Sequence, residues 1–196
     1  MSDIKVVIFD FFGVFCPDIT LEWFKTTVPD HQAKLATFQS ICTRSDYGQL
    51  SRKDFFKEVS ELAGISIPSM ESGVEAQTVI DMKLVKFVKH LKNAGYRMVC
   101  LSNGTHEWTL RVITDNGLGS LFDEIVLSGD LGIVKPNPQI YLTMLRKLDI
   151  TPNEAIFIDD KKINIDAANE LGIVSILFES TASLIDQLQK LFDIAN

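Results

Sequence analysis

The chain has few cationic residues, and this scarcity excludes two classes of partner. Its 19 lysine and arginine residues stand against 26 aspartate and glutamate residues, which gives a net charge of -7. A chain of this charge has no broad positive surface, so we expect neither nucleic acid nor a membrane as a partner. A small anionic substrate stays compatible, because a metal ion and a few local cations can reverse the field inside a cleft.

Cysteine, histidine and long apolar runs are also scarce. The three cysteines, Cys16, Cys42 and Cys100, are far apart and form neither a CxxC pair for zinc nor a disulfide framework, which favours a reducing cytoplasm. The three histidines have no spacing typical of a metal site. The apolar stretch at 4–9 is too short for a signal sequence or a membrane span, so we expect a cytoplasmic protein.

Apolar segments in the rest of the chain predict an α/β protein. The 196 residues are 46% hydrophobic, enough for one core with a modest insertion. Short β-branched runs alternate with segments of helical periodicity, which is typical of a doubly wound parallel sheet. Strands are predicted at 4–9, 97–101, 124–127, 155–158 and 174–177, and helices at 82–93, 107–116, 138–148 and 163–171.

The segment 18–80 lacks a comparable strand. It carries amphipathic stretches such as 50–62, interrupted by proline and glycine. We therefore predict that 1–17 and 81–196 form the α/β core and that 18–80 is a small inserted helical domain.

Polar residues follow three of the predicted strands. In open α/β sheets, ligands bind at the carboxyl ends of the strands, so these side chains should converge on one crevice. Each also has an ordinary structural explanation, as a turn residue, a helix cap or a solvated loop lysine. The converging residues are Asp10, Ser102, Asn103, Asp159 and Asp160, with Lys135 in a loop before a helix.

The order of these residues resembles the haloacid dehalogenase-like (HAD) hydrolase superfamily. Its four motifs are matched by Asp10-Phe11-Phe12-Gly13-Val14, Leu101-Ser102-Asn103-Gly104, Val134-Lys135-Pro136-Asn137-Pro138, and Ile158-Asp159-Asp160 with Asn164. The resemblance implies a Rossmann-like core, and it makes the segment 18–80 the family's helical cap. The cap would hinge near residues 16–17 and 80–81.

The resemblance also implies a role for each polar residue. Asp10 would be the nucleophile that forms an aspartyl-phosphate, with the Lys135 ammonium beside it. Substrate oxygens would be bound by Ser102, Asn103 and Gly104, and Asn164 would orient the loop or Lys135. Magnesium would be held by the Asp10 side chain, the carbonyl of Phe12, and Asp160, with Asp159 close by or acting through water.

Phe12 departs from the pattern of the superfamily's phosphatases, most of which carry a second Asp there as general acid and base. Three functions stay open. The first is a magnesium-dependent phosphatase of a small phosphorylated metabolite, slowed by the missing Asp. The second is a metal-independent 2-haloacid dehalogenase, in which an aromatic residue is usual at this position and Arg44 would cradle the halide. The third is a weakly active or inactive homologue that binds a phosphorylated ligand or a protein.

Asp159 and Asp160 favour the phosphatase. Dehalogenases of this superfamily replace the acidic pair with polar residues, and without a cation the pair would place uncompensated negative charge beside Asp10. The sequence does not indicate the substrate, and the protein could be a monomer or a homodimer.

Overall fold

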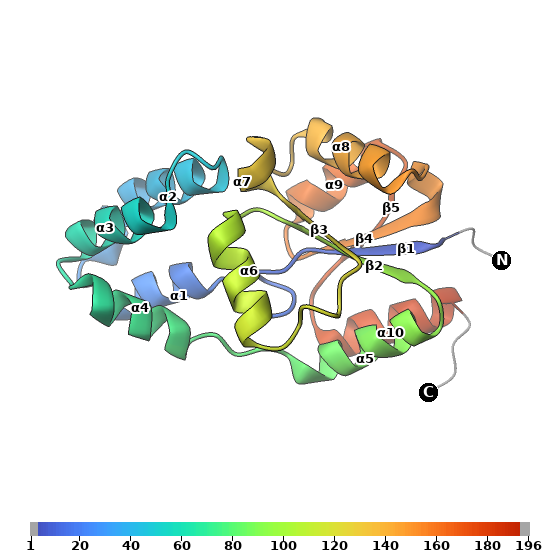
Figure 1. Cartoon of the computed structure of the whole chain (residues 1–196), viewed down its shortest axis with the longest axis horizontal. Helices are drawn as coiled ribbons and strands as arrows, with labels where there is room; N and C mark the ends of the chain where they lie inside the picture. Colours follow the sequence, from blue (N-terminus) through green and yellow to red (C-terminus); the bar gives the residue numbers. More distant parts are fainter. Residues whose placement is uncertain (1–3, 193–196) are drawn as a thin grey trace.

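A five-stranded parallel sheet forms the centre of the computed structural model, which describes residues 4–192 (Figure 1). The strand order is β3-β2-β1-β4-β5, so the first strand lies in the middle. The strands are β1 (Val6–Phe9), β2 (Arg97–Ser102), β3 (Glu124–Leu127), β4 (Ala155–Asp159) and β5 (Val174–Leu177). The predicted doubly wound parallel sheet is confirmed, with β1 beginning two residues later than the apolar run.

Both faces of the sheet are covered, which explains why β1 is a continuous apolar run. Val6 and Ile8 pack on one face with residues of α8 (Pro138–Leu148) and α9 (Lys162–Glu170). Val7 and Phe9 pack on the other face with residues of α5 (Met82–Asn93), α6 (His106–Asp115) and α10 (Thr181–Phe192). Alternation along one strand therefore feeds two separate apolar clusters.

Four helices follow β1 in the chain and lie together at one end of the molecule, at the left of Figure 1. We call them the α1–α4 region: α1 (Ile19–Thr27), α2 (His31–Asp46), α3 (Arg52–Ala63) and α4 (Ile67–Ala76). Asp18, Ser51 and Ser66 cap three of their N-termini by accepting backbone hydrogen bonds. Apolar side chains of this region join the cluster that contains Val7 and Phe9.

The chain leaves and re-enters the sheet layer at adjacent points. The backbone N–H of Asp81 donates to the carbonyl of Phe15 over 2.8 Å. Asp81 also caps α5 and accepts a short hydrogen bond from Thr181. Whether the α1–α4 region moves as a separate cap stays a prediction.

Two short elements complete the fold, α7 (Ser128–Leu131) and a 3-10 turn at Pro152–Glu154. Neither these two elements nor α10 was predicted from the sequence. Within residues 4–192, no helix has the length and apolarity that crossing a membrane requires.

Candidate active site

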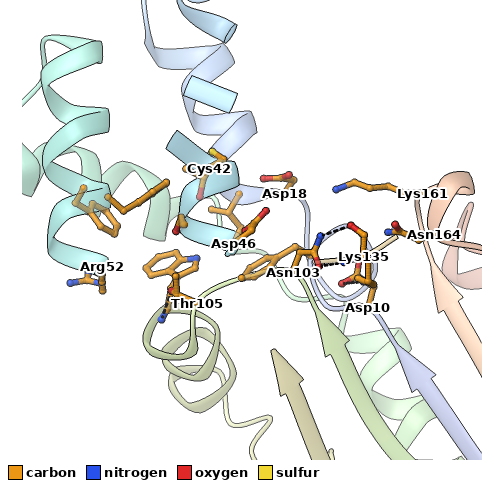
Figure 2. A pocket seen from close by; sticks show the side chains of 18 residues that line it. Asp10, Asp18, Cys42, Asp46, Arg52, Asn103, Thr105, Lys135, Lys161 and Asn164 are labelled. Atoms are coloured by element: carbon orange, nitrogen blue, oxygen red, sulfur yellow. Dashed lines mark hydrogen bonds and ion pairs between the residues drawn. The ribbon is translucent and has the colours of Figure 1, made fainter. Parts of the chain in front are cut away.

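The predicted site residues converge at the carboxyl ends of β1, β2 and β4, and a pocket opens there toward the α1–α4 region (Figure 2). Asp10 directly follows β1, while Ser102 and Asp159 are the last residues of β2 and β4. The pocket lining includes Asp10, Phe12, Asn103, Gly104, Lys135 and Asn164.

Lys135 lies between two carboxylates. Its Nζ is 2.9 Å from Asp10 Oδ1 and 2.7 Å from Asp159 Oδ2, and its side chain is only 1% exposed. Burial by itself lowers the pKa of Lys135, but Asp10 and Asp159 raise it more, and the net pKa lies above the ordinary value of 10.5. Lys135 is therefore a permanent positive charge beside Asp10.

Asp10 has an unusually high pKa for a carboxylic acid. Its pKa is raised to about 7, mainly by burial and also by Asp159 and Asp160, although Lys135 acts in the opposite direction. Asp10 Oδ1 accepts hydrogen bonds from the backbone N–H of Phe11, over 2.7 Å, and from Lys135. Oδ2 is left without a hydrogen-bond partner among the described residues. Lys135 and Lys161 do not balance the charge of the three carboxylates Asp10, Asp159 and Asp160, so a further cation would favour the ionised form of Asp10.

Asp159 is saturated with hydrogen bonds. Its Oδ1 accepts from the backbone N–H of Lys161 over 2.8 Å and from Asn164 Nδ2 over 2.9 Å, while Oδ2 accepts from Lys135. Asn164 is itself held by Tyr141, whose hydroxyl donates to the Asn164 carbonyl over 3.1 Å. Among the described residues, Asn164 thus reaches Lys135 only through Asp159.

Asp160 differs from its neighbour. Its Oδ1 is buried and has no hydrogen-bond partner among residues 4–192. The backbone of Gly13 lies against its carboxylate, since a Cβ added at Gly13 would be 2.5 Å from Asp160 Cγ. Gly13 also has a φ of +95°, so this close approach of the Phe12–Gly13 peptide depends on glycine.

These carboxylates fit a hard divalent cation. Oxygen atoms of Asp10, Asp159 and Asp160 lie within 4.8 Å of one another. Carboxylate oxygens are ligands that Mg²⁺ prefers. One of these oxygens, Asp160 Oδ1, is buried and has no partner in the described part of the chain. The alternative of a helix cap does not account for Asp160, because Lys161 is the N-cap residue of α9.

The loop after β2 is fixed to the Lys135 loop. The Asn103 side chain accepts from the Lys135 N–H over 2.9 Å and donates to the Lys135 carbonyl over 3.1 Å. Ser102 is fully buried and its hydroxyl donates to the Asn103 carbonyl over 3.4 Å, outside the pocket lining. The Gly104 N–H donates to Ser128 Oγ over 3.0 Å.

The Phe12 ring lines the pocket with an apolar surface. It packs edge-on against Phe11 with 5.1 Å between ring centroids, and Phe11 is fully buried in the core. At position 12, where the resemblance would imply an acid, the side chain therefore supplies only an apolar ring.

Arg44, the predicted halide cradle of the dehalogenase alternative, lies elsewhere. Its guanidinium pairs with Glu58 at 2.5 Å on the surface of the α1–α4 region, and it is absent from the pocket lining. The buried Cys16 thiol has a pKa raised to about 12 by burial and by the nearby charges of Asp10 and Asp18. It is therefore a poor nucleophile.

The α1–α4 region and α6 contribute pocket residues that sequence reasoning missed. Arg52 is flanked by aromatic rings, with Cζ 4.6 Å from the Phe56 centroid and 5.8 Å from that of Trp108, and it pairs with Glu71 at 2.6 Å. Residues missed in this way include Asp18, Asp46, Arg52, Phe55, Phe56 and Trp108. No motif marks them, because packing of helices far apart in sequence brings them together.

Comparison with known families gives one match that covers more than half of the chain. The family model described as haloacid dehalogenase-like hydrolase matches residues 69–178. The D-ribitol-5-phosphate phosphatase of Bacteroides thetaiotaomicron is 28% identical over 201 residues, covering 94% of this chain and 97% of that protein. Bifunctional epoxide hydrolase 2 of Mus musculus is 41% identical over 73 residues, 37% of this chain but only 13% of the relative's length.

Solved structures share the whole fold. A HAD family enzyme from Bacteroides thetaiotaomicron superposes with a TM-score of 0.80 at 24% identity, covering 96% of this chain and 98% of that one. The same enzyme in complex with magnesium and inorganic phosphate gives a TM-score of 0.77 at 23% identity, with 92% and 98% covered. A dehalogenase superposes with a TM-score of 0.73 at 18% identity, covering 97% of this chain and 98% of that one. At these identities the likeness establishes the fold.

Proposed function

The chain belongs to the haloacid dehalogenase-like hydrolase family, and from this premise we propose that it is a magnesium-dependent phosphatase of a small phosphorylated metabolite. The observation that carries the proposal is the buried cluster in which Lys135 contacts Asp10 and Asp159, while one Asp160 oxygen has no partner in the described part of the chain. A cluster of like charges with too few cations is costly in a fold and typical of a catalytic site.

Asp10 is the proposed nucleophile. Its Oδ1 is held by Phe11 and Lys135, which leaves Oδ2 to attack phosphorus. The attack forms an aspartyl-phosphate and releases the alcohol, and water then releases phosphate and restores Asp10. Lys135 stabilises the negative charge of the transferring oxygens without a change in its own protonation.

Magnesium would be held by Asp10, Asp160 and the carbonyl of Phe12. When bound, the ion would neutralise the negative charge that the carboxylates and the phosphoryl group bring together. Because Asp159 is already saturated by Lys135, Lys161 and Asn164, it serves as the partner of Lys135 and leaves the direct contact to Asp160. The magnesium and phosphate bound by the related Bacteroides enzyme support this assignment.

Substrate contacts would come from both sides of the pocket. On the sheet side, Asn103 and Gly104 line the pocket directly, and the buried Ser102 supports their loop. On the other side, the segment 18–80 would act as a cap that closes over the substrate and excludes water. Its hinges would be residues 16–17 and 80–81, next to the hydrogen bond between Asp81 and Phe15. The phosphorylated polyol of the Bacteroides relative makes sugar and polyol phosphates the first esters to assay.

A 2-haloacid dehalogenase is the second candidate, because Phe12 suits a halide, which leaves without a proton. Two observations place it second. Arg44 is paired with Glu58 outside the pocket, and the acidic residues Asp159 and Asp160 would repel a haloacid carboxylate in the absence of a metal.

The test is an assay of purified protein with a panel of phosphate esters and with 2-chloropropionate, each with Mg²⁺ or with EDTA. We expect phosphate release that requires Mg²⁺ and is lost in Asp10→Asn. Chloride release that is insensitive to EDTA would replace the phosphatase by the dehalogenase, and activity on neither class would refute both.

A further inference from the structure

One carboxylic acid in the pocket is not used by the mechanism above. Asp46 is the last residue of α2 and lines the same pocket as Asp10, Phe12 and Lys135. Figure 2 shows it on the helical side of the pocket, facing the strand ends that carry Asp10. Its carboxylate has no hydrogen bond or ion pair within the described residues 4–192, so it is free to act on a ligand.

Direct contacts with the core hold Asp46 in position. The Ser128 hydroxyl donates to the Asp46 carbonyl over 2.6 Å and accepts from the Gly104 N–H over 3.0 Å. Close by, a Cβ added at Gly48 would be 2.2 Å from the Gly129 carbonyl oxygen, so the two backbones touch. The end of α2 is thereby docked on the loop that would bind the phosphoryl group.

The surroundings of Asp46 raise the pKa of its carboxyl group, so that it still holds a proton near neutral pH. The pKa of Asp46 is raised to about 7, mainly by burial and also by Asp18, although Lys161 and Lys135 act in the opposite direction. Cys42, one turn earlier on α2, also lines the pocket, and its own pKa is raised by burial and by Asp46. A group with a pKa near the working pH can both give and take a proton efficiently.

The proposed phosphatase has no acidic side chain at position 12. An alcohol leaves readily only if an acid protonates its oxygen, so another residue must supply that proton. We infer that Asp46 is a catalytic residue that protonates the leaving oxygen, supplied by the α1–α4 region in place of the acid that the first strand lacks. The inference rests on the proposed function and adds to it that the enzyme cleaves esters of ordinary alcohols.

The two steps balance as follows. In the first, Asp10 Oδ2 bonds to phosphorus, the ester P–O bond breaks, and its electron pair on the leaving oxygen takes the Asp46 proton to give the alcohol. In the second, water bonds to phosphorus and passes a proton to the Asp46 carboxylate, while the Asp10–phosphorus bond breaks. Asp46 ends protonated and Asp10 ionised, as both began.

The test compares two kinds of ester with Asp46→Asn. The leaving group of 4-nitrophenyl phosphate departs as nitrophenolate and needs no proton. The leaving oxygens of ribitol 5-phosphate and glycerol 3-phosphate must be protonated as they depart. We expect kcat/KM for the alkyl esters to fall by about 10²–10⁴-fold, the usual value of general acid catalysis, and that for 4-nitrophenyl phosphate to change by less than about threefold. Because kcat/KM reports the step that releases the alcohol, slow hydrolysis of the aspartyl-phosphate does not blur the comparison.

Controls separate chemistry from folding. Glu61→Gln, an exposed acid of α3 outside the pocket, should leave both esters unaffected. Asp46→Glu should restore part of the alkyl-ester activity. In the wild type, kcat/KM for alkyl esters should decline above about pH 7 as Asp46 loses its proton, and this decline should disappear in Asp46→Asn. The melting temperatures of all variants are measured alongside.

The outcomes are distinguishable. Equal losses on both ester types, or no loss on either, would refute the role of Asp46 and leave the phosphatase intact. A wild-type enzyme that cleaves only 4-nitrophenyl phosphate would also refute it, because such an enzyme has no working acid. If the wild type cleaves no ester, the proposed function fails and this inference fails with it.

Discussion

The two sides of the pocket differ in how their polar groups are paired. On the sheet side, Asp10, Lys135 and Asp159 form a buried ion network in which nearly every atom has a partner. On the helical side, the Asp46 carboxylate has no partner among residues 4–192, and the wall mixes polar side chains such as Asp18 with the aromatic rings of Phe55 and Phe56. The sheet side is thus held in a fixed arrangement, which the proposed phosphoryl transfer would require. In the proposed mechanism, the helical side would supply the leaving-group acid and the shape that selects the substrate.

Loss of Lys135 should have the largest effect, because the sheet side depends on it. Lys135→Met leaves Asp10 and Asp159 buried without their cation, so we expect the free energy of unfolding in EDTA at pH 7.5 to fall by about 3 kcal/mol. Urea denaturation measures it. Adding Asp159→Asn should recover part of the loss, and a Lys135→Met variant as stable as the wild type would contradict the paired network.

Phe12→Asp restores an acid on the sheet side. If Asp46 already serves as the acid, the gain in alkyl-ester kcat/KM should be small in the wild-type background. In Asp46→Asn it should be about 10²-fold, because the new acid then replaces the missing one. A double-variant cycle measures this difference, and equal gains in both backgrounds would show that Asp46 contributes no proton.

Asp46 should also make stability depend on pH. Its folded pKa of about 7 lies above the ordinary value of 3.8, so the folded state holds a proton that the unfolded state has lost. Stability from this group is therefore present below about pH 4 and is lost as the pH rises through 7.

In Asp46→Asn that loss disappears. The variant should equal the wild type at pH 4 and exceed it at pH 8 by about 1–3 kcal/mol, given about 1.4 kcal/mol per pKa unit and partial access of solvent. Urea melts in EDTA at both pH values test this. A constant difference between the two proteins would show that the carboxyl has an ordinary pKa.

The smallest effect is expected at Arg44, which lies in the α1–α4 region but outside the pocket. Its pair with Glu58 is 40% and 34% exposed, so Arg44→Ala should cost less than about 1 kcal/mol and leave turnover unchanged. Thermal melting and an ester assay check it. Loss of chloride release in this variant would revive the dehalogenase.

The same contrast explains what the sequence could predict. The bounds of β3, β5 and α8 agree with their patterns, and Asn137 caps α8, because periodicity and capping are local properties. The convergence of Asp10, Lys135 and Asp159 followed from the rule for strand ends.

Other features depend on contacts that no local pattern contains. The difference between Asp159 and Asp160 is set by which of them meets Lys135 and Asn164 in space. Asp46 ends a helix of weak amphipathicity and enters the pocket only because Ser128 and Gly129 dock that helix. The separation of 18–80 as a moving cap and the roles of the site residues stay predictions.

Acid quenching can show directly whether Asp10 accepts a phosphoryl group. Protein mixed with substrate and Mg²⁺ is quenched within milliseconds, digested and examined by mass spectrometry. We expect a phosphoryl group on the peptide that contains Asp10 when Mg²⁺ is present, and none when EDTA is present. A peptide esterified at Asp10 by 2-chloropropionate without metal, or no modification of Asp10 while phosphate is released, would contradict it.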